Sequence, residues 1–163
     1  GSLNPRKTIG TTLSLAIKIH FKLSEDEIKN KVFELLEKVE LTPPEVFYER
    51  HPHELSGGQQ QRVAIARAIS TEPKLIISDE AVASLDMSIR SEILKLLKKI
   101  NIETKVSMIM ISHDLSVLKN MCNRIAIMHL GKIVEIGDKE KILGSPQHNY
   151  TKKLISATLE IPN

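Results

Sequence analysis

Apolar residues follow a helical period in two stretches of the N-terminal part of the chain. After Ser24 they recur every three or four residues over 28–39, and Ser24 with Glu27 has the pattern of a capping box. A second periodic stretch covers 59–69, and Ser56, shortly before it, is a residue type that favours helix N-termini. Both stretches predict amphipathic helices with one buried face.

The other N-terminal segments have weaker patterns. Residues 1–10 contain a proline and two glycines without any period, which predicts a loop. The apolar residues of 13–19 alternate and fit either a short helix or a strand, of which we favour the helix. The helix predicted for residues 28–39 ends before Pro43-Pro44. After it we expect a loop through His51-Pro52-His53 up to the next helix.

The pattern changes after Pro73, where short apolar runs alternate with an amphipathic stretch. Residues 75–78 and 106–111 predict strands, and residues 88–100 between them predict a helix. A β-α-β order of this kind implies parallel strands joined by a right-handed crossover. The sequence therefore predicts an α/β fold for this part of the chain.

The C-terminal part predicts a hairpin followed by helices. Residues 124–130 and 133–136 flank Gly131-Lys132, which fits a two-residue turn that starts on glycine. From Asp138 onward the pattern is helical in two pieces, broken at 144–146. This part of the chain should therefore extend the α/β region.

Backbone groups at one helix start could bind an anion. The segment Leu55-Ser56-Gly57-Gly58-Gln59-Gln60-Gln61-Arg62 places a hydroxyl and two glycines where a helix begins. The N–H groups there and the positive end of the helix dipole attract negative charge. The segment therefore predicts a phosphate site.

Polar side chains follow both predicted parallel strands. Asp79 and Glu80 come directly after the first strand, and Ser112-His113 follows the second. Ligands of open parallel sheets bind at this edge, so these groups are expected to share a crevice that takes a magnesium nucleotide. Asp79 suits Mg²⁺, which needs few carboxylates. Glu80 could polarise an attacking water, and His113 could contact the γ-phosphate.

Two neighbouring patterns have simpler interpretations. Ser84-Leu85-Asp86 precedes a predicted helix, and Asp86 is well placed as its N-cap. His51 and His53 form a His-x-His pattern that could suggest a metal site, but the prolines and the missing third ligand favour a loop.

Composition and charge limit the classes of function. The chain has 163 residues, of which 41% are hydrophobic and 26% charged, and no apolar run approaches the ~20 residues of a membrane span. Without a signal-peptide pattern, we expect a cytoplasmic polypeptide. The net charge of +3 is interleaved along helices and aromatics make up 3%, which argues against nucleic-acid binding. We divide the chain into a helical domain, residues 1–72, and an α/β domain, residues 73–163.

Leu55–Arg62 and Leu75–Glu80, in this order and this close together, resemble the signature and Walker B motifs of ABC-type ATPases. From Ser2 to about Ala157 the chain is similar to the ATP-binding subunit of an ABC importer. Its peptide/nickel (oligopeptide and dipeptide) branch is suggested by three stretches: Ser2-Leu3-Asn4-Pro5-Arg6, His51-Pro52-His53-Glu54-Leu55 and Ser145-Pro146-Gln147-His148-Asn149-Tyr150-Thr151.

The resemblance implies a partial P-loop NTPase fold, in which a helical signature subdomain precedes the C-terminal part of a RecA-like parallel-sheet core. The chain contains no Gly-x-x-x-x-Gly-Lys-Ser/Thr loop, and the family's Q-loop glutamine would lie just upstream of Gly1. We therefore interpret the chain as the C-terminal part of an ATPase subunit and expect it to hydrolyse ATP negligibly by itself.

The resemblance also implies how the complete subunit works. ATP and Mg²⁺ would be held between two ATP-binding subunits, with Ser56, Gly57, Gly58 and Gln59 of one contacting the γ-phosphate bound by the other. Asp86 would lie in a loop that touches the opposite subunit. Closure of this homo- or heterodimer would drive a membrane permease, whose coupling helix docks on the helical domain at the cytoplasmic face. An extracytoplasmic binding protein would deliver peptides, nickel or metal chelates.

One departure and one alternative remain. Ala81 stands where the family usually has proline after the Walker B glutamate, which frees the backbone of that turn. The alternative is the C-terminal half of a chromosome or DNA-repair ATPase, which has similar motifs. That class needs a long heptad coiled coil, and the sequence has no sustained heptads.

Overall fold

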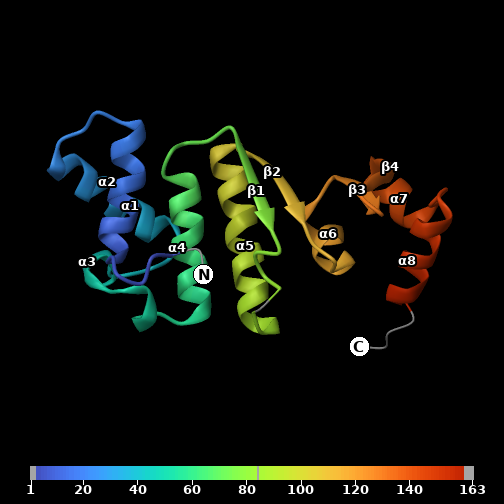
Figure 1. Ribbon diagram of the computed structural model, residues 1–163, viewed down its shortest axis with the longest axis horizontal. Coiled ribbons are helices and arrows are strands. Elements are labelled where there is room, and N and C mark those ends of the chain that lie inside the picture. The colour runs from blue at the N-terminus through green and yellow to red at the C-terminus, as the bar shows by residue number, and fades with distance from the viewer. Residues whose placement is uncertain (1–2, 84, 160–163) are drawn as a thin grey trace. The chain divides into compact units, whose positions relative to one another are not determined.

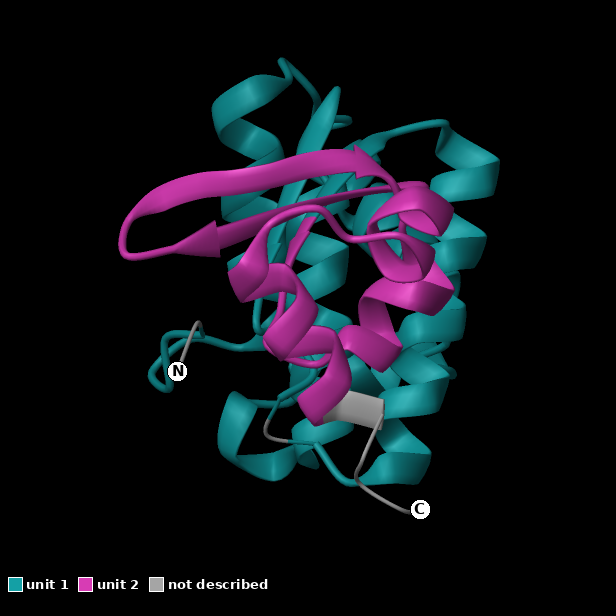
Figure 2. Ribbon diagram, turned by 90° about the vertical axis from the view of Figure 1, so that its right-hand side faces the viewer, with its two compact units in different colours: residues 1–109 teal, residues 110–163 magenta. Residues whose placement is uncertain are grey.

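The computed structural model describes residues 3–83 and 85–159, with the side chains of residues 158 and 159 left out (Figure 1). The chain forms two compact units, residues 1–109 and 110–163 (Figure 2). The division into two domains predicted near residue 72 rests on sequence patterns, whereas these units are defined by compactness, so that division stays a prediction. Elements of the first unit, in chain order, are α1 (Ile9–His20), α2 (Glu25–Lys38), α3 (Pro44–Glu49), the 3₁₀ turn η1 (Pro52–Glu54), α4 (Gly57–Ile69), β1 (Leu75–Asp79) and α5 (Met87–Thr104).

The helix favoured for residues 13–19 is confirmed and is longer than expected. In α1, Leu13 and Ile17 are fully buried while Leu15 and Ile19 are exposed, which is the four-residue repeat of an amphipathic helix. The loop prediction for 1–10 is wrong at its end, because the Thr8 hydroxyl accepts the Thr11 N–H and starts the helix at Ile9.

The capping box predicted for the second helix is confirmed. Ser24 accepts the N–H of Glu27, and the Glu27 carboxylate accepts the N–H of Ser24 at 2.7 Å. The Ser24 N–H, and then the Ser24 hydroxyl, donate to this carboxylate and lower the pKa of Glu27. Helices α1, α2 and α4 pack into one apolar core, whose fully buried members include Ile9, Leu13, Ile17, Val32, Leu36 and Val63.

The loop predicted between Pro43 and the glycines is wrong in part. Helix α3 begins at Pro44, a position where the missing N–H of proline costs no intrahelical hydrogen bond. Its Phe47 side chain is buried, so the segment is held by the core. The η1 turn follows, and Glu54 accepts the His51 N–H at its start. Two prolines therefore start short helical turns here instead of excluding them.

The predicted β-α-β order is confirmed. Strand β2 (Ser107–Ile111) is the hydrogen-bonded neighbour of β1, and the two strands run parallel (Figure 1). Helix α5 connects them and buries Ile93, Leu96, Leu97 and Ile100, while Ile89 is half-buried. The helix ends at Lys105, which adopts a left-handed backbone conformation.

The second unit is built around an antiparallel hairpin. After α6 (Leu115–Met121), where no element was predicted, strands β3 (Arg124–His129) and β4 (Lys132–Asp138) pair in antiparallel register. Ile125 and Ile127 of β3 pack in an apolar cluster with residues of α6, of α7 (Lys139–Gly144) and of α8 (Asn149–Leu159). The two helical pieces predicted for the tail are confirmed.

The predicted turn of this hairpin is shifted by one residue. His129 pairs with Lys132, so the turn residues are Leu130 and Gly131 and not Gly131-Lys132. Both have positive φ, 48° and 75°, as a mirror-type two-residue turn requires. Leucine rarely adopts this conformation, so the sequence pointed to glycine as the first turn residue.

Within the described ranges, no helix combines the length and apolarity needed to cross a bilayer.

Candidate functional site

The N-terminus of α4 is closed by its own side chains. The Ser56 hydroxyl accepts the N–H of Gln59 at 3.3 Å, and the Gln59 side-chain oxygen accepts the N–H of Ser56 at 3.0 Å. This is a reciprocal capping box, which satisfies two of the free N–H groups at the helix start. Both side chains therefore have a local structural role besides the phosphate contact predicted for them.

The capping box leaves the two glycines as the available donors. In the part of the chain that the structure describes, the N–H groups of Gly57 and Gly58 donate to no protein acceptor. They lie at the first positions of a helix of 13 residues, where the dipole is positive. Two N–H donors at the positive end of a helix dipole form a site that fits the oxygens of one phosphate group.

The two glycines are needed for different reasons. A Cβ atom on Gly58 would lie 2.7 Å from Cγ2 of Ile89 on α5, so glycine allows the close approach of the two helices. A Cβ atom on Gly57 would meet only Leu85 Cδ2, at 3.7 Å, which is ordinary contact. Packing therefore requires Gly58, whereas Gly57 leaves the exposed helix start open to a ligand.

Asp79 and Glu80 lie at the carboxyl end of β1, and both are exposed. Glu80 has a φ of 46°, in the left-handed region that non-glycine residues rarely adopt. Its carbonyl accepts the N–H of Ala83 at 3.1 Å, which closes a turn directly after the strand. Strained backbone of this kind often occurs at functional sites, where it fixes the direction of a side chain.

Asp86 begins α5 as predicted. Its carboxylate oxygen Oδ1 accepts the N–H of Ile89 at 3.0 Å and the hydroxyl of Ser88 at 2.8 Å. The Ile89 N–H, and then the Ser88 hydroxyl, lower the pKa of Asp86. Ser84 of the same predicted tripeptide lies outside the described residues.

The turn after β1 packs beside the start of α4. The contacts of Leu85 with Gly57 and of Ile89 with Gly58 join the two segments within the first unit. The structure thus brings the glycine pair next to the segment that follows Asp79 and Glu80.

His113 belongs to the second unit and follows β2 by two residues. The adjacent Asp114 accepts the N–H and the hydroxyl of Ser116 through Oδ1 and caps α6, and its own N–H reaches the Ser112 hydroxyl at 3.0 Å. The role of His113 toward a phosphate stays a prediction.

Sequence analysis missed two supports of the glycine segment. Gln60 donates from Nε2 to the carbonyls of Pro52 and Leu55, at 3.0 and 3.2 Å, and fixes the loop before α4. Arg62 donates from Nη1 to the Val39 carbonyl at 3.0 Å, and its guanidinium also pairs with Glu40 and Glu92. The only signal was their place within the motif: the carbonyls that Gln60 contacts belong to a loop without a pattern, and the partners of Arg62 lie 22 to 30 residues away.

A divalent cation would find few protein ligands here. No group of three or more His, Cys, Asp or Glu side chains suited to a metal occurs among the residues that the structure covers. Asp79 alone, exposed at the end of a strand, fits Mg²⁺, which keeps several waters and takes one or two carboxylates.

Comparisons with known proteins give a consistent result. A family model described as ABC transporter matches residues 2–83. The chain is 45% identical over 157 residues to the dipeptide transport ATP-binding protein DppF of Haemophilus influenzae, covering 96% of this chain and 47% of that protein. It is 45% identical over 156 residues to the glutathione import ATP-binding protein GsiA of Escherichia coli O6:H1, covering 25% of that protein. The chain thus spans about half or less of the relatives that it matches.

The solved structures agree. A dimeric post-hydrolysis structure of the ATP-binding cassette MJ0796, bound to ADP and Pi, is 32% identical with a TM-score of 0.72 and covers 84% of this chain and 59% of that one. The α/β fold with a helical signature segment, expected from the resemblance, is therefore confirmed as that of part of an ATP-binding cassette. With a family model matched over half of its length and relatives at 45% identity, this chain belongs to the ABC transporter family.

Proposed function

We propose that this chain is the C-terminal part of an ATP-binding subunit that couples ATP hydrolysis to the uptake of peptides, nickel or metal chelates. The similarity to proteins named for dipeptide transport and glutathione import supports the peptide side of this proposal. The stretches at residues 51–55 and 145–151 support the same branch.

The observation that carries the proposal is the start of α4. Ser56 and Gln59 close the capping box, and the N–H groups of Gly57 and Gly58 stay available at the positive end of the helix. Such a site binds a phosphate group from outside the helix. In the proposed dimer this phosphate is the γ-phosphate of ATP bound by the other subunit.

Residues after the strands complete the proposed chemistry. Glu80 orients the water that attacks the γ-phosphate, and His113 contacts that phosphate. Asp79 would hold Mg²⁺, which neutralises charge on the phosphate oxygens when it is bound. Asp86, already fixed as the N-cap of α5, lies in the loop that would face the opposite subunit.

The proposed partners follow from the same assignment. They are a second ATP-binding subunit, integral membrane permease subunits and, indirectly, an extracytoplasmic substrate-binding protein. The protein would then lie at the cytoplasmic face of the membrane.

The first experiment replaces Glu80 by Gln in the complete subunit. Because Glu80 is assigned to the water and not to nucleotide binding, the variant should retain ATP affinity, lose hydrolysis and accumulate as an ATP-bound dimer. Size-exclusion chromatography with and without ATP measures the dimer. A monomeric variant that no longer binds ATP would contradict the assignment.

The second experiment separates the effect of a negative charge at the start of α4 from the effect of a larger side chain there. Gly57→Asp places a carboxylate where phosphate should bind, so hydrolysis should be lost, whereas Gly57→Ala adds a methyl group that the structure accommodates. Ser56→Arg should resemble Gly57→Asp in outcome because of its bulk. Equal turnover in Gly57→Asp and Gly57→Ala would refute a phosphate site.

The third experiment addresses the chain by itself. Mixed with a fragment that contains the Walker A loop of the same subunit, it should gain ATPase activity that it lacks alone. Turnover by the chain alone that Glu80→Gln abolishes would mean that it binds the nucleotide without that loop.

A further inference from the structure

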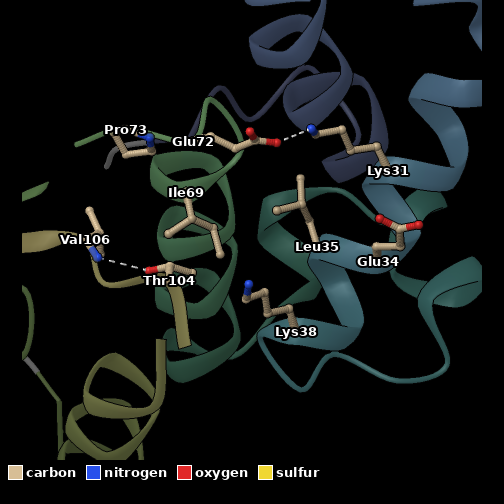
Figure 3. A pocket seen from close by; sticks show the side chains of 9 residues that line it. All are labelled: Lys31, Glu34, Leu35, Lys38, Ile69, Glu72, Pro73, Thr104 and Val106. Carbon is tan, nitrogen blue, oxygen red and sulfur yellow. Dashed lines mark hydrogen bonds and ion pairs between the residues drawn. The ribbon is translucent and has the colours of Figure 1, made fainter. Parts of the chain in front are cut away.

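A cavity lies within the first unit at the opposite end of α4 from the glycine pair (Figure 3). Its volume is about 370 Å³, at the small end of the range of ligand pockets. Ile69, the last residue of α4, lines it, and Ile69 lies 12 positions after Gly57. At about 1.5 Å per residue, the cavity is roughly 18 Å from the proposed phosphate site and is separate from it.

Residues of α2, α4 and α5, of the loop after α4 and of the segment before β2 line the cavity. Leu35 on α2, Ile69 on α4 and Val106 before β2 supply an apolar wall. Lys31 and Glu72 form an ion pair at the rim, so their charges largely cancel. Figure 3 shows this pair on one side of the cavity and Leu35 between it and Lys38.

Among the described residues, Lys38 and Glu34 are the charged side chains of the lining that lie outside this ion pair. No hydrogen bond or ion pair is recorded for the Lys38 ammonium group in the described part of the chain, and its side chain is half-buried. Figure 3 shows the ammonium turned toward the cavity and toward Thr104, while Glu34 lies on the outer rim. The Thr104 hydroxyl already donates to the Ile100 carbonyl, so it does not neutralise the lysine.

We propose that this cavity binds a small organic anion with an apolar body, whose acidic group pairs with Lys38 and whose body contacts Leu35, Ile69 and Val106. A charge-assisted contact in a half-buried position is stronger than one at an open surface. The apolar wall gives little to a purely inorganic anion, so the ligand needs both parts. The site is independent of the proposed ATPase chemistry.

The test uses 1-naphthoate as the probe and the complete purified protein. Its binding is followed by fluorescence titration and by chemical-shift changes of backbone amides. Lys38→Met removes the charge and keeps the apolar stem, and it should weaken binding about tenfold or more. Lys38→Arg should restore most of the affinity. Lys98→Met, on an exposed position of α5, is the matched control and should leave the affinity unchanged.

Two further probes test the two parts of the ligand. The neutral analogue 1-naphthalenemethanol should bind wild-type protein and Lys38→Met equally weakly, and inorganic phosphate should not compete with naphthoate. The shifted amides should be those around Leu35, Ile69 and Val106. Unchanged naphthoate affinity in Lys38→Met, or shifts confined to the exposed faces of β1 and β2, would overturn the proposal. Because neither readout depends on ATP, failure here leaves the proposed ATPase function untouched.

Discussion

The helices of the first unit and its strand pair differ in how completely they bury their apolar residues. Leu13 and Leu36 of the helices are 0% exposed, whereas Ile77 of β1 is 63% exposed and Ile109 of β2 is 48% exposed. Each helix needs cover on one stripe only, and neighbouring helices provide it. A parallel strand pair needs cover on both faces. The helical part thus completes its own core, and the strand pair presents an apolar face that a further layer could cover.

The largest expected effect is the difference between a substitution in the helical core and one on the exposed face of the strand pair. Leu36→Ala should lower the free energy of unfolding by about 2–5 kcal/mol, because it leaves a cavity in a closed core. Ile77→Ala, at an exposed position, should change it by less than about 0.5 kcal/mol. Urea denaturation followed by circular dichroism measures both. Equal losses would show that the strand face is covered in solution and would break the comparison.

The next effect tests whether polar contacts contribute to the closed helical part. Arg62 is 13% exposed and links α4 to the Val39 carbonyl, Glu40 and Glu92. Arg62→Met should cost about 1.5–3 kcal/mol, because it removes charged hydrogen bonds and leaves the Val39 carbonyl without this donor. Glu92→Gln is the control and should cost less, since Arg62 keeps its other partners. Equal losses would mean that the exposed Glu92 pair, and not the carbonyl contact, accounts for the stability.

Local patterns in the sequence predicted the elements whose ends are set locally. The box formed by Ser24 with Glu27 was predicted from residue types three positions apart, and Ser56 was predicted as an N-cap; α2 and α4 begin directly after these two serines. The Asp86 cap was predicted in the same way. The start of α3 at Pro44 was missed, because burial of Phe47 in a distant core decides it.

The site was predictable as a set of motifs but not as a geometry. The sequence indicates that Gly57 and Gly58 matter, yet both look alike in it. Only the contact of Gly58 with Ile89, which is distant in sequence, shows that Gly58 is needed for helix packing and Gly57 for access of a ligand. The same holds for Arg62, whose partners lie at the end of α2 and on α5. Contacts between distant segments have no local signal.

The third prediction uses the different roles of Gly57 and Gly58. Gly58→Ala should destabilise the protein by about 1 kcal/mol or somewhat more, because its Cβ would lie 2.7 Å from Ile89 and the helices must shift apart. Gly57→Ala should stabilise it by about 0.5 kcal/mol, because alanine loses less backbone freedom in a helix. Thermal unfolding distinguishes the two. Gly58→Ala should cost less stability in an Ile89→Ala background, which lacks the Cγ2 atom, than in wild-type protein, and an unchanged cost would place the strain elsewhere.

The smallest expected effect concerns the second unit, where the hairpin has one buried apolar face and one exposed apolar face. Ile125 and Ile127 of β3 are buried in the cluster, while Met128 and Ile133 on the opposite face are more than half exposed. Glu135 of β4 pairs with the buried Ile127 and so lies on the same face of the hairpin, where its carboxylate accepts the N–H groups of Gln147 and His148 at 2.9 and 3.1 Å. These bonds attach the start of α8 to β4.

Glu135 should make the stability of this unit depend on pH. The Thr151 hydroxyl, and then the N–H of Gln147, lower the pKa of Glu135. Thr151 Oγ1 is buried and makes no hydrogen bond of standard geometry among the described residues, so the direct bonds to the carboxylate are those of Gln147 and His148. A lowered pKa in the folded state means that the stabilisation is present above the ordinary glutamate pKa of about 4.3 and is lost as pH falls through the folded value.

Glu135→Gln keeps an acceptor oxygen but cannot titrate, so it should remove this part of the pH dependence between about pH 5 and 3 and lower stability only slightly at neutral pH. Glu135→Ala should lower stability at neutral pH more. The fluorescence of Tyr150 in a Tyr48→Phe background reports unfolding of the second unit alone, because these are the two tyrosines of the chain. If wild-type protein and Glu135→Gln lose stability in parallel as the pH falls, the carboxylate does not fix α8, and α8 is held by apolar packing as the helices of the first unit are.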